Sequence, residues 1–200
     1  MVSFPAPAER ILMLKFALLG FLLRNPMTGY DLAQAIKHSI NFVWPAQLSQ
    51  IYRTLGQLEQ DHLVVSEVEP QQGRPDRRVY AITADGRQAF DTWLGEMVTE
   101  LDPVRIPFMV RFFFYGTRPP QEAITQLRVI RDLHLRLRDH LATDLRDQLT
   151  AMAAHHTGDD LDPLIVDSVR RAGEMMSQTW LDWIDETIER LEAATPRAAT

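Results

Sequence analysis

The chain has 200 residues, of which 46% are hydrophobic and 24% are charged, and 21 basic against 27 acidic side chains give a net charge of −6. That apolar fraction suffices for a folded core and excludes a wholly disordered chain. The acidic balance excludes a globally basic nucleic-acid-binding surface, and the absence of cysteine excludes a disulfide framework and zinc sites with cysteine ligands.

Acidic side chains are concentrated in the second half of the sequence. Through Glu96 there are 9 basic and 10 acidic residues, a net charge of −1, whereas the remainder has 12 and 17, a net charge of −5. Any binding to nucleic acid must therefore depend on local positive charge.

The longest apolar run, residues 11–23, does not predict a membrane span. It has 13 residues and contains Lys15, whereas a spanning helix needs roughly 20 apolar residues. Its flanks also differ from those of a secretory signal peptide, because Glu9 precedes the run. We expect a cytoplasmic protein that does not bind a membrane.

The first 60 residues predict three helices. Residues 9–24 are apolar on every side, which is typical of a buried helix. Thr28 and Asp31 form a capping-box pattern that begins a second helix, ending near residue 39. Pro45 is predicted to lie in the first turn of a third helix, which continues to about residue 60.

The third helix has two different faces. Helical periodicity groups its apolar positions on one side, which we expect to face the core: Leu48, Ile51, Tyr52, Leu55 and Leu58. The opposite side carries amides, a hydroxyl and one guanidinium: Ser49, Gln50, Arg53 and Gln57. The only acid of the segment, Glu59, lies among the apolar positions.

A β-hairpin and a fourth helix are predicted next. Residues 63–69 and 77–82 are rich in Val, Ile and Tyr and flank a turn-forming stretch. Arginines gather around this stretch and give it a local charge of +2 against one acid: Arg74, Arg77 and Arg78. Because side chains alternate along a strand, Arg78 could instead lie on the other face and pair with an acid. Thr83 is predicted to cap a helix to about residue 100, whose apolar stripe holds Phe90, Trp93, Leu94 and Met97.

Two long amphipathic helices are predicted in the second half. Apolar positions at helical spacing run from residue 121 to about 155, and a second series follows Pro163, which lies in a first turn. A short loop between them predicts an antiparallel helical hairpin. Such a hairpin has little core of its own, so its stripe should pack on a partner chain or on the first domain.

The order of three helices, a hairpin and a further helix is that of a winged helix-turn-helix domain. In this fold the third helix enters the major groove of DNA and the wing contacts the backbone or minor groove. Gln, Ser and Thr side chains can donate to and accept from base edges, and Arg can bind guanine through two hydrogen bonds. The wing arginines would contact phosphates.

The residues also resemble one known family, the PadR-like transcriptional regulators, and within it the group with a long helical C-terminal region. Three motifs carry the resemblance, in order and at suitable spacing: MTGYDLAQAI (27–36), WPAQLSQIYRTLGQLEQDHLV (44–64) and GRPDRRVYAITADGRQAFDTWL (73–94). The second half is similar more loosely, through IPFMVRFFFYG (106–116) and the two-helix pattern.

The resemblance implies a dimeric repressor whose third helix binds an inverted-repeat operator. It places Gln50, Tyr52 and Arg53 in the recognition segment, and Gly73, Arg74 and Arg77 in the wing. It also implies dimer contacts through the C-terminal helices, for which the stripe positions predicted here are Leu141, Leu145, Met176, Trp180 and Trp183. Ligand-responsive members suggest a small-molecule effector, with Trp93 as a residue of the effector pocket; a core position for Trp93 is the alternative.

Two departures from the family pattern stand out. The third helix ends at Asp61-His62, where the family usually has glycine, and His tolerates a left-handed backbone at some cost. After Trp44-Pro45 the chain has Ala46-Gln47-Leu48, where small polar residues are more usual. This second departure leaves the preferred DNA sequence open.

Other chemistries find little support in the sequence. No nucleophile, phosphate-loop or dinucleotide-binding motif is present, so we expect no enzyme and no cofactor. His155, His156, Asp159 and Asp160 could be drawn as a metal site, but neighbouring residues of a polar loop rarely converge on one ion, and no metal is expected.

The sequence therefore predicts a mainly α protein with a small β-hairpin. We expect a winged helix-turn-helix DNA-binding domain over residues 1–100, a connector over 101–120 and an antiparallel two-helix dimerisation region over 121–200. The expected function is a homodimeric, sequence-specific regulator of transcription, most simply a repressor, that binds double-stranded DNA. The alternative is a helical protein-interaction module that uses the same fold without binding DNA.

Overall fold

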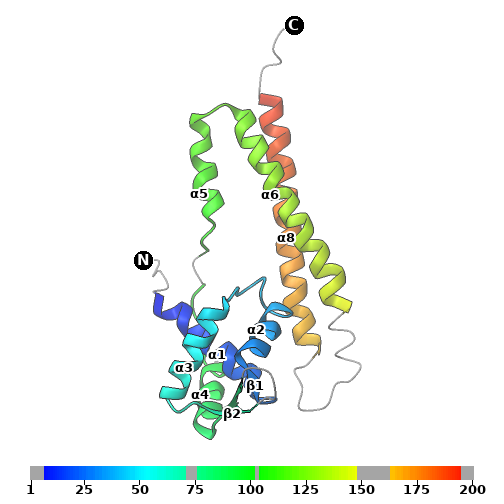
Figure 1. Ribbon diagram of the computed structural model, residues 1–200. Coiled ribbons are helices and arrows are strands. Elements are labelled where there is room, and N and C mark those ends of the chain that lie inside the picture. Colours follow the sequence, from blue (N-terminus) through cyan, green and yellow to red (C-terminus); the bar gives the residue numbers. More distant parts are fainter. Residues whose placement is uncertain (1–6, 71–75, 102–103, 148–162, 195–200) are drawn as a thin grey trace. The chain divides into compact units, whose positions relative to one another are not determined.

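The computed structural model describes residues 7–70, 76–101, 104–147 and 163–194, and the side chains from residue 13 onward within them. The chain divides into two compact units, Met1–Pro103 and Val104–Thr200. The structure is mostly helical with one small sheet, as the sequence predicts (Figure 1). None of its described helices is long and apolar enough to cross a membrane.

The first unit has the winged helix-turn-helix order of elements. Its helices and strands are α1 (Pro7–Leu22), β1 (Met27–Thr28), α2 (Gly29–Lys37), α3 (Leu48–Gln60), β2 (Val64–Glu69), β3 (Arg77–Ile82) and α4 (Ala84–Leu94). The strands form an antiparallel sheet in the order β1-β3-β2. The predicted hairpin is therefore confirmed, and β1 adds a third strand that two residues could not reveal by periodicity.

The core of this unit lies between the helices and one face of the sheet. Its most buried side chains come from α1, α2, α3, β2 and β3: Leu14, Leu18, Leu19, Leu22, Leu32, Ile36, Ile51, Leu55, Leu58, Val64 and Tyr80. Two positions predicted to face this core do not, because Leu48 is 45% and Tyr52 46% exposed at the edge of the α3 stripe.

Local hydrogen bonds set the ends of the helices. The predicted capping box begins α2, with the Asp31 amide donating to Thr28 Oγ1 at 3.1 Å and the Thr28 amide to Asp31 Oδ2 at 3.2 Å. The prediction for Pro45 was wrong, because α3 begins at Leu48. The Gln47 amide donates to Gln50 Oε1 at 2.9 Å, and this bond caps the helix at Gln47, so that α3 starts three residues beyond the proline.

The end of α3 confirms the strained position expected at His62. Its φ is +59°, in the left-handed region, and its amide donates to the Glu59 carbonyl while the Leu63 amide donates to the Leu58 carbonyl. These two bonds form a Schellman motif, which normally uses glycine at this position. The motif turns the chain directly from α3 into β2.

The fourth helix is shorter than predicted. The Thr83 hydroxyl accepts a hydrogen bond from the Gly86 amide at 3.0 Å, as its predicted capping role requires. However, α4 ends at Leu94 before Gly95. Leu94, the last residue of α4, and Met97, which lies beyond the helix, are 65% and 87% exposed, so their predicted place on the apolar stripe facing the core was wrong.

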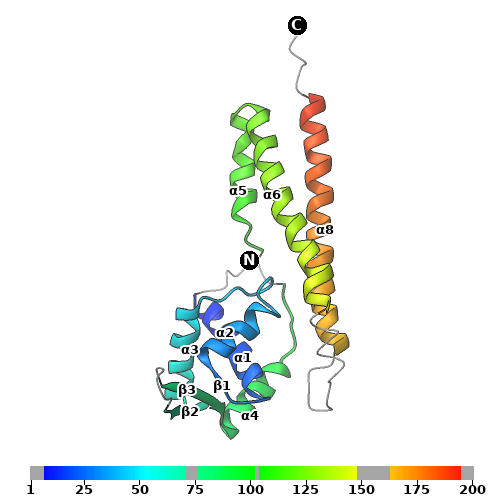
Figure 2. The same cartoon turned by 45° about the vertical axis from the view of Figure 1, so that its right-hand side comes forward.

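The second unit is a helical hairpin with a short helix before it. It contains α5 (Pro107–Phe113), the 3-10 turn η1 (Phe114–Thr117), α6 (Pro120–His140), the π-helical segment η2 (Leu141–Leu145) and α8 (Pro163–Ala194). Helices α6 and α8 run antiparallel and side by side, as predicted (Figures 1 and 2). The predicted loop residues His155, His156, Asp159 and Asp160 lie outside the described residues.

Apolar side chains and ion pairs hold α6 against α8. The buried apolar side chains are Ala123, Ile124, Leu127, Leu141, Leu145, Leu181 and Ile184. Arg131 makes two hydrogen bonds to Asp185, at 2.6 and 3.1 Å, and Arg128 pairs with Glu192 at 2.9 Å. Because two aligned bonds restrict both side chains, the Arg131 pair also fixes the register of the helices.

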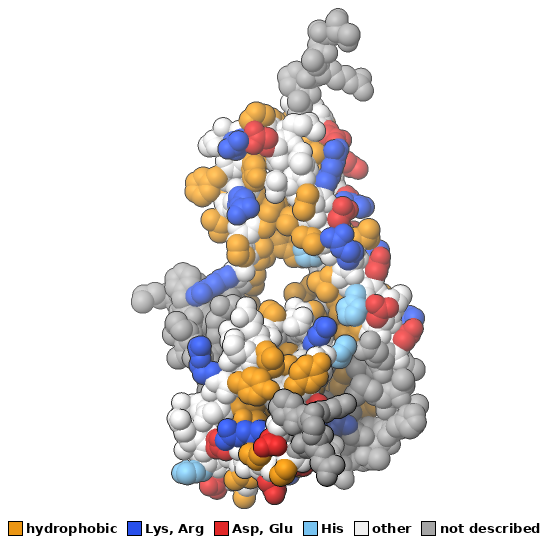
Figure 3. All heavy atoms as spheres, in the orientation of Figure 1, with side chains coloured by type: hydrophobic (Ala, Val, Ile, Leu, Met, Phe, Trp, Pro, Cys, Tyr) orange, Lys and Arg blue, Asp and Glu red, His pale blue; other side chains and the backbone are white. Residues whose placement is uncertain are grey.

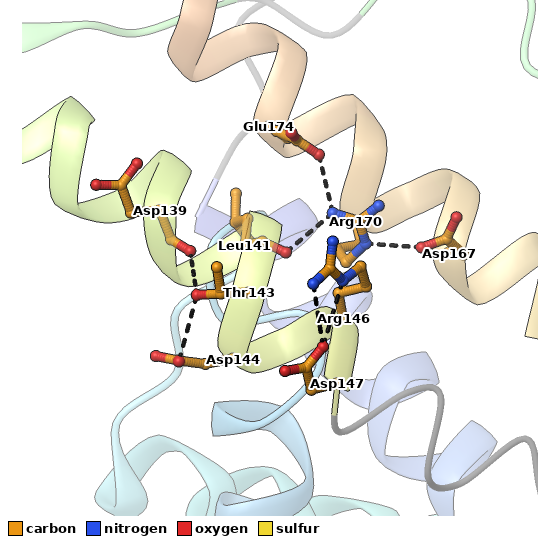
Figure 4. Close-up of polar contacts among 9 residues, drawn as sticks. All are labelled: Asp139, Leu141, Thr143, Asp144, Arg146, Asp147, Asp167, Arg170 and Glu174. Carbon is orange, nitrogen blue, oxygen red and sulfur yellow. Dashed lines mark hydrogen bonds and ion pairs between the residues drawn. The ribbon is translucent and has the colours of Figure 1, made fainter.

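The π-helical segment is tied to α8 by a buried arginine (Figure 4). Arg170 is 6% exposed and donates to the Leu141 carbonyl at 2.9 Å, to Asp167 at 2.7 Å and to Glu174 at 2.9 Å. A π turn disturbs the regular carbonyl pairing of a helix. The guanidinium satisfies the carbonyl at this point, and its two carboxylates compensate the buried charge.

Candidate nucleic-acid interface

The polar face of α3 is exposed as the sequence predicts. Ser49, Gln50, Arg53 and Gln57 all face solvent. Arg53 makes no hydrogen bond or ion pair with the described part of the chain, so its guanidinium is free to bind two acceptors of a base or a phosphate. Arg53 is the only charged side chain among these four residues of α3.

Two amides of this face are partly engaged within the chain. Gln50 Oε1 accepts from the Gln47 amide at 2.9 Å, which leaves the Gln50 NH2 group as the donor that faces outward. Gln57 Nε2 donates to Asp61 Oδ1 at 2.9 Å. Both contacts hold long side chains in one orientation and so reduce the conformational entropy that binding would cost.

Tyr52 lies against the start of α2, at a position that only glycine permits. A Cβ atom on Gly29 would lie 2.5 Å from Cε1 of the Tyr52 ring, inside van der Waals contact. Because Gly29 has no side chain, the ring packs on the α2 backbone while nearly half of Tyr52 stays exposed. The contact connects α2 and α3, the two helices of the helix-turn-helix.

The two described arginines of the wing point to different helices. Arg77 Nη2 lies 2.8 Å from Asp31 Oδ2 on α2, and Arg78 Nη2 lies 2.6 Å from Glu59 Oε2 on α3. The pairing of Arg78 with an acid is thus confirmed. Arg74 lies outside the described residues, so its predicted contact with DNA stays a prediction.

Both acids are held ionised by their neighbours. The Thr28 hydroxyl lowers the pKa of Asp31, burial opposes this effect, and Arg77 adds to it. The Ser66 hydroxyl lowers the pKa of Glu59 in the same way, against burial and together with Arg78. Both carboxylates are therefore charged at neutral pH, and the two ion pairs are intact.

Sequence reasoning missed the full roles of these acids. Asp31 was expected only as a capping residue, and Glu59 stood out only as the one acid among apolar positions. The capping box and the charge on an apolar stripe were both visible signals, because an acid in either place needs a donor. Their partners were not visible, since they lie 46 and 19 residues further along the chain.

The residues predicted for dimer contacts differ in exposure. Leu141 and Leu145 are buried inside the hairpin of a single chain, whereas Met176 is 66% exposed. Trp180 stacks on His134 with ring centroids 5.2 Å apart, and Trp183 meets Trp180 edge-on at 5.4 Å. Among this set, Met176 therefore has the most surface to offer to a second chain.

The residue predicted for an effector pocket packs within the first unit. The Trp93 ring stacks on Phe16 with centroids 4.7 Å apart and lies near Phe90 at 5.6 Å. These contacts match the alternative considered for a tryptophan on a helical stripe. The pocket role of Trp93 stays a prediction.

The order of elements and the exposed polar face of α3 are those expected of a winged helix-turn-helix regulator of transcription. Two family models match the chain: "Transcriptional regulator PadR-like family" over residues 18–92 and "Virulence activator alpha C-term" over residues 104–192. A probable transcriptional regulator of Mycobacterium tuberculosis, Rv1176c, is 30% identical over 90% of this chain and 97% of its own. The protein belongs to the PadR-like family, whose members are transcriptional regulators and not enzymes.

Solved structures share the fold over nearly the whole chain. Bacillus subtilis PadR in complex with operator DNA has a TM-score of 0.73 at 22% identity, covering 94% of this chain and 99% of that one. The structure of the same protein in complex with p-coumaric acid has a TM-score of 0.68. In sequence, this negative transcriptional regulator is 29% identical over 55% of this chain and 60% of its own. The Vibrio cholerae virulence activator AphA gives 0.71 at 24% identity over 91% and 99% of the two chains.

Proposed function

We propose that the protein is a homodimeric repressor that binds an inverted-repeat operator through α3 and the wing. The observation that carries this proposal is the exposed face of α3, where amide and hydroxyl groups accompany a single arginine, Arg53, that has no partner among the described residues. Such a face suits base edges of the major groove, and an acid there would repel phosphates. The operator complex of Bacillus subtilis PadR supports the same use of the fold.

The proposed DNA contacts are those of the recognition helix and the wing. On α3 they are Ser49, Gln50, Tyr52, Arg53 and Gln57, and in the wing they are Arg74 and Arg77. Arg77 can bind a phosphate only by sharing or leaving Asp31, which it contacts at 2.8 Å. Its contribution to affinity should therefore be smaller than that of Arg53.

The proposed division of the chain follows the sequence analysis. Residues 1–100 bind DNA, residues 101–120 connect, and residues 121–200 form the dimer through the C-terminal helices. Repression fits the relative named a negative regulator. The p-coumaric acid complex of Bacillus subtilis PadR supports a small-molecule effector, which would release the operator by favouring a state unable to bind both half-sites.

An anisotropy titration tests the role of Arg53. A duplex selected by the wild-type protein from a randomised pool is compared with a scrambled duplex at about 50 and 200 mM salt, the range over which phosphate contacts weaken. Arg53→Ala should lower operator affinity by about 1 to 3 kcal/mol, because a guanidinium-to-base contact is lost. It should also lower the ratio of operator affinity to scrambled-duplex affinity.

The matched control is Arg136→Ala. Arg136 is exposed on α6 of the second unit and has no partner within the described ranges, so the change in net charge is the same. This variant should bind like the wild type. If Arg53→Ala also bound the operator as tightly as the wild type, the recognition face would be wrongly placed. Equal, weak, salt-insensitive binding of both duplexes by the wild type would favour a protein partner instead.

A further inference from the structure

Three side chains from α3, β2 and β3 form a closed hydrogen-bonded triangle at the base of the wing. Ser66 Oγ donates to Glu59 Oε1 at 2.5 Å, and Arg78 Nη2 donates to Glu59 Oε2 at 2.6 Å. Arg78 Nε donates to Ser66 Oγ at 2.8 Å, which closes the triangle. Each member thus contacts both of the others, and the carboxylate uses both oxygens.

The strand register and one aromatic ring hold this triangle in place. Ser66 lies opposite Tyr80 on β3, and Arg78 lies opposite Val68 on β2. The Arg78 guanidinium also lies 5.4 Å from the centroid of the Tyr80 ring, which is buried in the core. A cation over an aromatic face is attracted to it. Arg78 is therefore oriented from two sides, unlike Arg53, which contacts no polar partner in the described part of the chain.

The triangle joins the recognition helix to the wing directly. Glu59 lies in the last turn of α3, and the Schellman motif at His62 leads from it into β2. Apart from the triangle, this corner is held by the sheet, by the core and by the Thr83 hydroxyl, which follows β3 and donates to the His62 carbonyl at 2.8 Å. The triangle adds a polar connection on the outer side of the same corner.

We propose that Glu59 and Arg78 are positioning residues that fix the wing relative to α3 and thereby raise operator specificity. This inference rests on the proposed function. A helix and a wing that contact the same duplex gain full affinity only when their spacing is fixed before binding, because otherwise binding must order them. Partly exposed ion pairs add little to stability, so the effect should fall on DNA binding more than on folding.

Glu59→Gln tests the proposal with little change of shape. The variant loses the charge that holds Arg78, so the freed guanidinium should become a phosphate contact. Binding to scrambled duplex should tighten and its salt slope should steepen by about 1, as one more phosphate contact predicts. The ratio of operator to scrambled affinity should fall about tenfold, the scale of one unfavourable base pair.

Glu67→Gln is the matched control. Glu67 lies on β2, is exposed, and has no polar partner among the described residues, so the substitution changes the net charge equally and leaves the triangle intact. We expect it to raise both affinities slightly and to leave their ratio unchanged. If Glu59→Gln and Glu67→Gln behaved alike, only net charge would matter and the positioning role would be overturned.

Arg78→Gln distinguishes positioning from direct contact. A positioning residue should lower the affinity ratio with the salt slope unchanged, whereas a phosphate-binding arginine should lower the slope by about 1. A lower slope would overturn the proposal. A wild type that binds operator and scrambled duplex equally would overturn the proposed function as well, whereas wild-type discrimination retained in both triangle variants would overturn this inference alone.

Discussion

At the scale of single residues, His134 has the least satisfied environment of the second unit's described side chains. Its imidazole stacks on the Trp180 ring, nearly parallel at 8°, and its Nδ1 atom is buried without a hydrogen-bond partner in the described structure. Burial lowers the pKa of His134, because the charged imidazolium would lose its hydration without gaining an acceptor. The folded protein therefore favours the neutral ring.

This environment predicts acid sensitivity of the second unit. The unfolded chain binds a proton at His134 more readily than the folded chain, so stability is complete above the ordinary histidine pKa and falls as the pH drops below it. His134→Phe keeps the stack on Trp180 and removes the titrating group. Between about pH 7.5 and pH 5.5, the urea midpoint of the variant should fall less than that of the wild type, measured by helical circular dichroism. Equal losses in the two proteins would contradict this explanation.

Residue-scale prediction from the sequence succeeded where periodicity alone decides exposure. The polar face of α3 is exposed because every fourth position of a helix returns to the same side, so Ser49, Arg53 and Gln57 were identified correctly. The ion pair between Arg77 and Asp31 joins residues 46 positions apart. Pairing at that separation depends on the packed fold and has no local signal.

At the scale of elements, those with hydrogen-bonding caps in the sequence were predicted best. The capping box of α2 and the Thr83 cap of α4 are both present. Pro45 was a weaker signal, since proline fits a first turn but also extended chain. The two residues of β1 and the π turn after His140 have no characteristic sequence pattern. The strand β1 forms by pairing with β3, and Arg170 stabilises the π turn through its hydrogen bond to the Leu141 carbonyl.

Two glycines in helices predict opposite effects of the same substitution. A Cβ atom on Gly86 in α4 would lie 2.1 Å from the Leu63 carbonyl oxygen, where backbone must move, whereas one on Gly56 in α3 would meet nothing within 4 Å. Gly86→Ala should therefore destabilise the first unit by about 2 kcal/mol or more through overpacking. Gly56→Ala should stabilise it by about 0.5 to 1 kcal/mol through helix propensity.

Urea unfolding of both alanine variants tests these expectations. The two proteins carry the same chemical change, so Gly56→Ala is the control for Gly86→Ala. A loss of stability in both would show that helix propensity does not dominate at Gly56. No loss at Gly86 would show that α4 can move away from the start of β2.

At the scale of the whole molecule, the second unit exposes large apolar side chains that are not buried within its own helical hairpin. In Figure 3 hydrophobic side chains gather on its surface around α5, where Met109, Val110, Phe113 and Phe114 are exposed. On α8 a further exposed set follows one face: Ile165, Val169 and Met176. Their spacing of four and seven residues matches the seam of a helix that packs on another helix.

The exposed seam of α8 predicts that a charge there prevents the proposed dimer. Met176→Glu would bury an unpaired carboxylate in an apolar helix contact, which costs more than such a contact contributes. We expect a monomer by light scattering, at concentrations where the wild type is a dimer. Operator affinity should fall by about 100-fold or more, because two linked half-sites then bind independently, while Arg53 and the wing remain intact.

Arg171→Glu is the control for this effect. Arg171 is exposed on the same helix, five residues earlier and therefore about 140° around the axis. It should leave the assembly unchanged, since the new carboxylate faces away from the seam. A Met176→Glu protein that remained dimeric would place the dimer contact elsewhere, with the exposed aromatic side chains of α5 and η1 as the next surface to substitute. Dimeric Met176→Glu with weakened operator binding would instead show that α8 controls the spacing of the two DNA-binding units and not their association.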